Sequence, residues 1–344
     1  MPKYAILASG AFDYILNKTG NMLIRYESQS VAAVIDKENA GRPVQDILGY
    51  GGNIPVVGSF ADSIQYDPDT LVIGNAPQGG FISPEYRAEI LSAIKYNCHV
   101  ISGMHAFLKD DETICATAEE YGVNLVDLRK PPNPPHFPKG SWRERNIPVL
   151  LTVGTDCDTG KMTTAWEISV HLKKRGWNAK FIGTGQTGIL LGGGVPIDAV
   201  TGDFMAGEIE HVIDNFSKEC DCIIVEGQGA LTHMLYSGVT LGLLHGSMPD
   251  FMVLTHDANR RMDTAGQPMI SLEKTMSQYL DLVTLFRSSK FVGINLMTVN
   301  MDEKTALDIC ENTQDKHDLP TTDLVRFGER GLIEHIDFEL RQWN

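Results

Sequence analysis

Hydrophobic and polar residues follow a repeating order along the whole chain. Short β-branched runs, bounded by glycine and polar residues, are separated by longer segments whose apolar positions recur every three or four residues. The short runs are typical of buried strands and the longer segments of amphipathic helices. Because the two patterns alternate, we expect an α/β fold with mainly parallel sheets.

The pattern predicts six strands in each half of the chain. In the first half they are residues 4–8, 31–35, 54–57, 71–73, 100–101 and 125–126. In the second half they are residues 149–153, 180–182, 222–225, 251–254, 291–294 and 323–325.

Helix signals fill the intervals between these strands. The clearest helix follows Ser83, a good N-cap, and Pro84, which suits a first helical turn. Its apolar stripe consists of Ile90, Leu91 and Ile94. Further helices are expected after Lys161 and over residues 203–218, 271–286 and 302–312.

A proline-rich segment separates the two halves. Residues 131–138 contain five prolines, each of which removes a backbone donor and restricts the residue before it. Such a segment is a stiff, extended connector rather than part of a sheet. We therefore expect a Rossmann-like domain over residues 1–130, a linker over residues 131–146 and a P-loop NTPase-like domain over residues 147–344.

Composition narrows the class of partner. The formal net charge of −15 argues against nonspecific nucleic-acid binding, which needs clustered lysine and arginine. No apolar stretch reaches the roughly 20 residues that span a bilayer. The six cysteines lack zinc-site spacing and indicate reduced thiols. We expect a cytoplasmic homo-oligomer that acts on a small molecule and binds neither nucleic acid nor a membrane.

The clearest chemical signal is the loop after the expected strand 149–153. The letters GTDCDTGK place glycines where backbone N–H groups can surround a phosphate, and Lys161 where it can reach that phosphate. The alternative, a glycine-rich turn with an incidental lysine, fits the strand–loop–helix context less well. The predicted cofactor-binding residues are Gly154, Thr155, Asp156, Cys157, Asp158, Thr159, Gly160, Lys161, Met162, Thr163 and Thr164.

Two departures from the usual phosphate loop affect the expected cofactor. Five residues, not four, separate Gly154 from Gly160, and Met162 occupies the position where a hydroxyl normally binds Mg²⁺. Thr163 supplies that hydroxyl only if the helix begins one residue later. The loop therefore suits a pyrophosphate that is not cleaved, such as that of coenzyme A. Acetyl-CoA is the expected cofactor, and ATP with Mg²⁺ is the alternative.

An acidic residue on a second strand fits a phosphate loop. The expected strand 222–225 is followed by Glu226 and a Gly-x-Gly turn. Phosphate-loop proteins hold Mg²⁺, or the water bound to it, at such a strand end. Asp156 and Glu226 are therefore the predicted metal ligands if Mg²⁺ is used.

These two segments resemble dethiobiotin synthetase and related enzymes, which carry GTD-x-x-x-GK and VEGAG. The resemblance implies that Asp156, Asp203 and Glu226 stand where that group binds Mg²⁺.

A closer resemblance extends over the whole chain. It rests on GTDCDTGKMTT, GTGQTGILL, DAVTGDFMAGEIE, IIVEGQGAL, HGSMPD and TDLVRFGE. These segments resemble a family catalogued as a domain of unknown function, one branch of which is a D-glutamate N-acetyltransferase that uses acetyl-CoA. The resemblance implies an acetyl-CoA-dependent N-acetyltransferase for an acidic amino acid, such as D-glutamate. An ATP- and Mg²⁺-dependent ligase and a non-catalytic nucleotide-binding module are the alternatives.

Acetyl transfer to an amine needs a base, donors for an oxyanion and cations for the substrate carboxylates. Open parallel sheets bind ligands beyond the carboxyl ends of their strands. The catalytic candidates are Glu226, His256 and Asp203, with Glu226 or His256 as the base. The substrate-binding candidates are Gln186, Thr187, Gln228, Arg260 and Arg261, the arginines being suited to a dicarboxylate.

Some of these residues also have a structural interpretation. His256 could simply cap its strand, and one of the two arginines could be a surface residue. His233 suits a structural role as well as a functional one, and Cys157 lies in a loop where backbone geometry matters more than thiol chemistry.

The first half of the chain carries weaker signals. Asp36 follows the second expected strand, where dinucleotide-binding folds place a ribose-binding acid, but no G-x-G-x-x-G follows the first strand. The loop over residues 74–80 lies between a strand and a helix. Ligand binding and a tight crossover both fit that loop.

Overall fold

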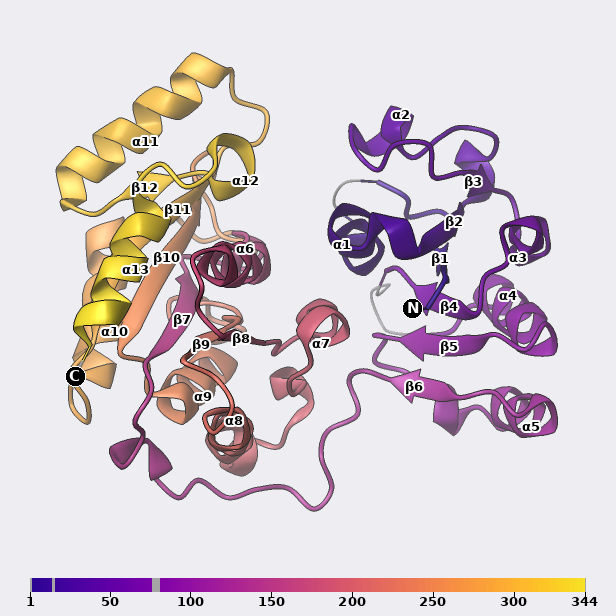
Figure 1. Cartoon of the computed structure of the whole chain (residues 1–344), viewed down its shortest axis with the longest axis horizontal. Helices are drawn as coiled ribbons and strands as arrows, with labels where there is room; N and C mark the ends of the chain where they lie inside the picture. Colours follow the sequence, from indigo (N-terminus) through magenta and orange to yellow (C-terminus); the bar gives the residue numbers. More distant parts are fainter. Residues whose placement is uncertain (1, 14–15, 76–80, 344) are drawn as a thin grey trace. The chain divides into compact units, whose positions relative to one another are not determined.

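The computed structural model describes residues 2–13, 16–75 and 81–343. The chain divides into two compact units, Met1–Lys130 and Pro131–Asn344, each with its own sheet and core (Figure 1). Both sheets have six strands, and all the neighbouring strands within them are parallel.

The first sheet has the strand order β3-β2-β1-β4-β5-β6, which is the order of dinucleotide-binding Rossmann folds. Its strands are β1 (Tyr4–Leu7), β2 (Val31–Ile35), β3 (Val56–Val57), β4 (Thr70–Ile73), β5 (His99–Ser102) and β6 (Leu125–Asp127). The helices of this unit are α1 (Lys18–Tyr26), α2 (Gln45–Leu48), α3 (Phe60–Ser63), α4 (Pro84–Lys95) and α5 (Glu112–Tyr121).

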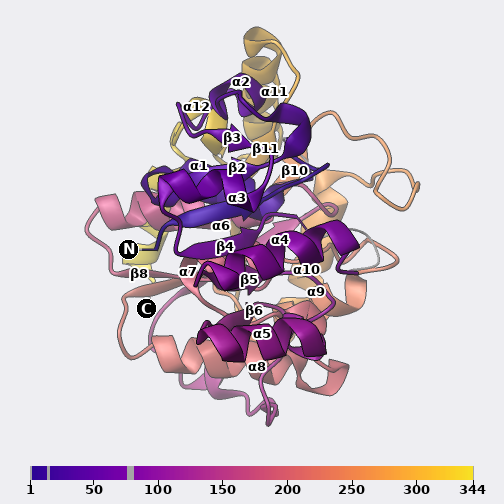
Figure 2. The ribbon, with the colours of Figure 1, turned by 90° about the vertical axis from the view of Figure 1, so that its right-hand side faces the viewer.

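Helices cover both faces of this first sheet. Phe60 of α3, Ile90 of α4 and Ile114 of α5 are fully buried in one core with the strands. Figure 2 shows these three helices on one face of the sheet, and Figure 1 shows α1 on the other. The expected helix after Ser83 is confirmed, because the Ser83 side chain accepts a hydrogen bond from the backbone N–H of Tyr86.

Asp36 is used by the protein itself. Its side chain follows β2 and is 1% exposed. One carboxylate oxygen accepts the backbone N–H of Gly10 (3.0 Å) and the other accepts Nδ2 of Asn39 (2.6 Å). The Asp36 carboxylate therefore holds the segment after β1. An acid that binds ribose would instead have its carboxylate oxygens available to the ligand. Of the glycine loop 74–80, residues 76–80 lie outside the described residues.

The second sheet has the order β12-β11-β10-β7-β9-β8. Its strands are β7 (Val149–Gly154), β8 (Ala179–Ile182), β9 (Cys222–Val225), β10 (Phe251–Asp257), β11 (Lys290–Met297) and β12 (Thr321–Thr322). The helices are α6 (Lys161–Lys174), α7 (Gln186–Gly192), α8 (Gly202–Phe216), α9 (Ser237–Ser247), α10 (Leu272–Val283), α11 (Glu303–His317), α12 (Leu324–Phe327) and α13 (Leu332–Gln342).

Two separate cores fix this second sheet. Side chains of α6 and α13 pack on one face, whereas side chains of α8, α9 and α10 pack on the other. The central strand β7 is buried along its whole length, and it lies between β10 and β9. The carboxyl ends of β7, β9 and β10 therefore meet at one edge of the sheet.

The proline-rich segment is attached to α8. Carboxylates of this helix accept hydrogen bonds from the few backbone donors that the prolines leave. Glu208 accepts the N–H of His136 (2.6 Å), and Glu210 accepts the N–H of Lys139 (2.7 Å). These bonds place the segment in the second unit.

One expected strand is wrong. Residues 323–325 do not form a strand, because β12 ends at Thr322 and α12 begins at Leu324. Asp323 is the N-cap of that helix, and its side chain accepts the backbone N–H of Arg326 (3.2 Å). An aspartate before an apolar pair fits a helix start as well as a strand, and the capping bond decides it.

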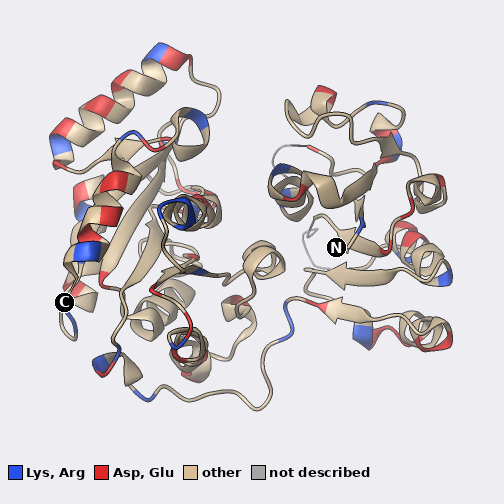
Figure 3. Ribbon diagram, viewed as in Figure 1, with Lys and Arg blue, Asp and Glu red and all other residues tan. Residues whose placement is uncertain are grey.

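Charge is distributed by element. Figure 3 shows that the strands carry few charged residues, whereas outer helices such as α11 carry both signs. None of the helices in the described part of the chain is long and apolar enough to cross a membrane. The cytoplasmic location and the homo-oligomer stay predictions.

Candidate active site

The phosphate loop, residues 155–160, joins β7 to α6 (Figure 1). Backbone φ is positive at Asp158 (56°) and at Gly160 (88°), the residue that precedes the first turn of α6. The first four N–H groups of a helix have no partner within it. The loop therefore ends in backbone donors that suit an anion.

Lys161 is held inside this loop. The residue is 7% exposed. Its Nζ donates to the backbone carbonyl of Asp156 (2.6 Å) and to Oγ1 of Thr159 (3.4 Å). Burial lowers the pKa of Lys161 to about 8, although neighbouring negative charges, including Asp156 and Glu226, oppose this shift. The Lys161 ammonium group is thus held at the loop by hydrogen bonds to the Asp156 carbonyl and to Thr159.

Asp156 joins the loop to the segment that follows β10. The residue is fully buried. One oxygen accepts NH1 of Arg260 (2.6 Å) and the N–H of Thr264 (2.9 Å), and the other accepts Oγ1 of Thr264 (3.1 Å) and the N–H of Cys157 (2.7 Å). Burial acts to raise the pKa of Asp156, but these bonds, above all that from Arg260, lower it below its usual value. The carboxylate is ionised and its oxygens are occupied.

Two threonine hydroxyls fix the loop to β10. Oγ1 of Thr155 lies 2.9 Å from Nδ1 of His256, and Oγ1 of Thr159 lies 2.8 Å from Oγ1 of Thr255. The N–H of Thr155 also donates to the carbonyl of Thr255 (3.1 Å). The loop side chains and the N–H groups of Thr155 and Cys157 therefore hold the loop itself, so the donors that suit a ligand are those at the start of α6 together with Lys161.

Glu226 lies at the end of β9 against the start of α7. Its Oε2 accepts the N–H groups of Thr184 (2.8 Å) and Gly185 (3.2 Å), and the residue is 5% exposed. A Cβ on Gly188 would overlap the Glu226 carboxylate, so glycine is required there. Burial raises the pKa of Glu226 to about 7, although the two N–H groups and Lys161 act against this shift.

The three catalytic candidates differ in their surroundings. Glu226 titrates near neutrality. Burial lowers the pKa of His256 to about 4; the charge of Asp257 opposes this shift and those of Arg260 and Arg261 reinforce it, so this imidazole is neutral and a weak base. Asp203 lies in the exposed first turn of α8. Of the three, Glu226 is the group suited to accept a proton at neutral pH.

The predicted substrate residues do not form one group. Nε2 of Gln228 donates to Oγ1 of Thr184 (3.2 Å), which places Gln228 beside Glu226. Gln186 begins α7 and is half-buried, and Thr187 follows it. Arg261 is exposed, whereas the Arg260 guanidinium is bound to Asp156.

The donor set does not fit the Mg²⁺ ion that ATP chemistry would require. Asp156 already accepts hydrogen bonds from Arg260 and from the backbone, and Glu226 already accepts two N–H groups of the α7 turn. Because α6 begins at Lys161, Met162 stands where the metal-binding hydroxyl would be, and Thr163 does not replace it.

A second possible metal cluster also fails on hydrogen-bond grounds. Ligand atoms of Asp156, Cys157 and His233 lie within 4.8 Å of one another. Nδ1 of His233 accepts the N–H of Leu235 (3.2 Å), so Nε2 carries the proton and is placed 2.9 Å from Oγ1 of Thr264. A protonated ring nitrogen cannot bind a metal ion. Burial raises the pKa of the Cys157 thiol, so an ion would also have to displace the thiol proton.

Sequence reasoning missed several residues of this site. Thr255 contacts the loop, Thr264 contacts Asp156 and Tyr279 contacts Gly154 just before the loop, and none of the three belongs to a recognisable motif. Tyr279 lies on the apolar stripe of α10, where its hydroxyl had no sequence signal. Thr264 could have been found from the sequence, because the polar segment after β10, residues 258–264, also contains both candidate arginines.

Two family models match the chain. One is a P-loop domain described as a domain of unknown function (DUF1611_C), and it matches residues 136–333. The other is a Rossmann-like domain of unknown function (DUF1611_N), and it matches residues 37–131. The chain belongs to the DUF1611 family. The predicted family and the predicted α/β fold, with Rossmann-like and P-loop domains, are confirmed.

Solved and curated relatives agree with this assignment. The crystal structure of a DUF1611 family protein from Anabaena variabilis is 35% identical, with a TM-score of 0.92, and the match covers 98% of this chain and 100% of that one. A D-glutamate N-acetyltransferase from Tritonibacter scottomollicae is 38% identical over 78% of this chain and 80% of its own. A second D-glutamate N-acetyltransferase, from a Pseudoalteromonas species, is 32% identical over 81% of this chain and 84% of its own.

The bond between Asp156 and Arg260 yields a prediction about stability. Arg260→Ala should lower the free energy of unfolding by about 3 kcal/mol, because it leaves a buried carboxylate without its cation. In an Asp156→Ala background the same change should cost less than about 1 kcal/mol. All four tryptophans lie in the second unit, so their fluorescence in a denaturant titration follows this unit. Arg261→Ala is the control, and strictly additive losses would contradict the coupling.

Proposed function

We propose that this DUF1611 protein is an N-acetyltransferase that moves the acetyl group of acetyl-CoA to the amine of an acidic amino acid, D-glutamate. The observation that carries the proposal is the pair of buried groups that follow the neighbouring strands β7 and β9: the Lys161 ammonium, at the start of α6 after the loop, and the near-neutral Glu226 carboxyl, directly after β9. The names of the two relatives from Tritonibacter and Pseudoalteromonas support the reaction and the acceptor.

The phosphate loop suits a pyrophosphate that remains intact. Its backbone donors and Lys161 can neutralise a diphosphate without a metal ion. Cleaving a nucleotide phosphate normally needs Mg²⁺, and both oxygens of Asp156 and Oε2 of Glu226 already have protein partners. The loop therefore favours coenzyme A, whose diphosphate is bound but takes no part in the reaction.

Glu226 is the base in this proposal. Its pKa of about 7 makes it a carboxylate in most molecules just above neutral pH, so it can take a proton from the substrate ammonium. The amine nitrogen then forms a bond to the thioester carbonyl carbon, and it gives up its second proton to solvent as the carbon–sulfur bond breaks. The coenzyme leaves as a thiolate, which recovers the proton from Glu226.

Two other residues complete the reaction. The Gln228 amide donates one hydrogen to Thr184, and its second hydrogen is available to the oxyanion that forms on the acetyl carbonyl. Arg261 is exposed beside His256, and its guanidinium suits a substrate carboxylate. Arg260 serves instead to hold Asp156.

The charges near the loop nearly cancel. Lys161, Arg260 and Arg261 are balanced by Asp156, by Asp257 and by the other carboxylates that act on Lys161. An anionic donor therefore meets backbone dipoles and one buried ammonium rather than a broad positive surface. This arrangement makes binding depend on the shape of the loop.

Two parallel assays test the function. Thiol release from acetyl-CoA is measured with D-glutamate, L-glutamate and a panel of neutral and basic amino acids, and phosphate release from Mg·ATP is measured with the same panel. We expect thiol release with D-glutamate above the other amines. Amine-dependent phosphate release without thiol release would replace this proposal with an ATP-dependent ligase.

The assignment of the base gives a pH prediction. Below pH 7 Glu226 is protonated and cannot accept a proton, so kcat/KM for the amine should rise with pH up to about 7 and then level off. Glu226→Gln should lower kcat by about 10²- to 10⁴-fold and remove the rise of kcat/KM below pH 7, the acidic limb of the pH profile. Glu303→Gln, at an exposed position of α11, is the control. An unchanged limb in Glu226→Gln would assign the base to another residue.

A further inference from the structure

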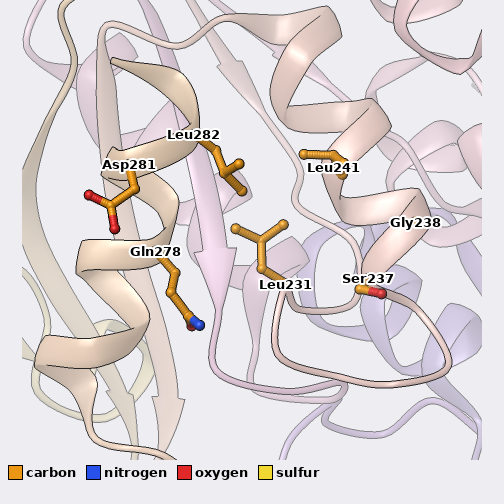
Figure 4. A pocket seen from close by; sticks show the side chains of 7 residues that line it. All are labelled: Leu231, Ser237, Gly238, Leu241, Gln278, Asp281 and Leu282. Atoms are coloured by element: carbon orange, nitrogen blue, oxygen red, sulfur yellow. The ribbon is translucent and has the colours of Figure 1, made fainter. Parts of the chain in front are cut away.

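An open groove lies between α9 and α10, on the face of the second sheet opposite α6 (Figure 4). Its volume is about 440 Å³. Leu231, Leu241 and Leu282 give it apolar walls, and Figure 4 shows their side chains gathered around one space. A Cβ on Gly238 would meet no atom within 4 Å, so the first turn of α9 borders open space.

One polar atom in the lining needs a donor. Oε1 of Gln278 is buried, and no described residue donates a hydrogen bond to it. A buried acceptor without a partner favours any ligand that brings an N–H or O–H group. Among the described residues that line the groove, Asp281 is the one with a charged side chain, and none is a lysine or an arginine. The groove therefore suits a neutral chain with apolar segments and amide donors.

Three hydrogen bonds, made by the hydroxyls of Tyr279 and Thr240, join this groove to the candidate active site. The Tyr279 hydroxyl donates to the carbonyl of Gly154 at the end of β7 (3.2 Å) and accepts the N–H of Leu231 (3.3 Å). On the other wall, Oγ1 of Thr240 donates to the carbonyl of Gln228 (2.8 Å). One side chain thus separates the groove from the phosphate loop, and another separates it from the residues that follow Glu226.

We infer that the groove binds the pantetheine arm of the acyl donor. The inference rests on the proposed function, because it assumes that coenzyme A is the carrier. The arm is the neutral part of that molecule, with two amide N–H groups and a branched apolar segment, and it is attached to the diphosphate. The loop takes the diphosphate, the leucines contact the branched segment, and an amide N–H donates to Gln278 Oε1.

Calorimetric titrations of the full chain with two probes test this division. Acetyl-CoA carries the arm, and ADP carries the diphosphate without it. Leu241→Trp fills the groove and should weaken acetyl-CoA binding at least tenfold while ADP binding stays within twofold. Leu285→Trp, at a side chain that is 72% exposed beyond α10, is the matched control and should change neither affinity.

A second variant, in α10, keeps the test valid if Leu241→Trp distorts α9. Gln278→Leu removes the unpaired acceptor and should weaken acetyl-CoA binding about three- to tenfold, again without an effect on ADP. Unchanged acetyl-CoA affinity in both groove variants would overturn the inference, and a changed oligomeric state would then assign the groove to a second copy of the chain. Wild-type protein that binds ADP but not acetyl-CoA would instead overturn the proposed function.

Discussion

A buried ammonium group organises the carboxyl end of the second sheet. Lys161 is 7% exposed, and a charge in such a position is tolerated only when it is paired and hydrogen-bonded. The Asp156 carbonyl binds it directly, and the charges of Asp156 and Glu226 act on it from nearby. An incoming anion can take over the role of these internal partners. The same residue therefore stabilises the loop, and in the proposed function it also binds the diphosphate of the donor.

The backbone around Lys161 is shaped by this close packing. A Cβ on Gly227 would overlap the carbonyl of Thr152 and lie 3.1 Å from Cδ of Lys161. Gly188 likewise makes room for the Glu226 carboxylate. The glycines in VEGQG and GTGQTG thus serve the approach of backbone to buried charged side chains. That arrangement places Lys161 and Glu226 at the carboxyl edge of the sheet.

Local patterns were enough to predict most strands, the loop and its placement at a sheet edge. The role of the Asp156 side chain was beyond such patterns, because its partners Arg260 and Thr264 lie more than a hundred residues later in the chain. The same limit applies to the hydroxyl of Tyr279, which bonds to Gly154, just before the loop, from the apolar side of a helix. At Asp323 the local signal itself was ambiguous, and a side-chain capping bond favoured helix over strand.

The central role of Lys161 can be measured with two variants of one helix. Lys161→Met and Lys174→Met remove the same charge from the first and last residues of α6, and Lys174 is exposed. Acetyl-CoA affinity by calorimetry should fall at least tenfold in Lys161→Met, since a hydrogen bond to a charged group contributes about 1.5–3 kcal/mol. It should change less than about twofold in Lys174→Met, whose charge is screened by solvent. Equal affinities for the two variants would contradict a phosphate loop organised around Lys161.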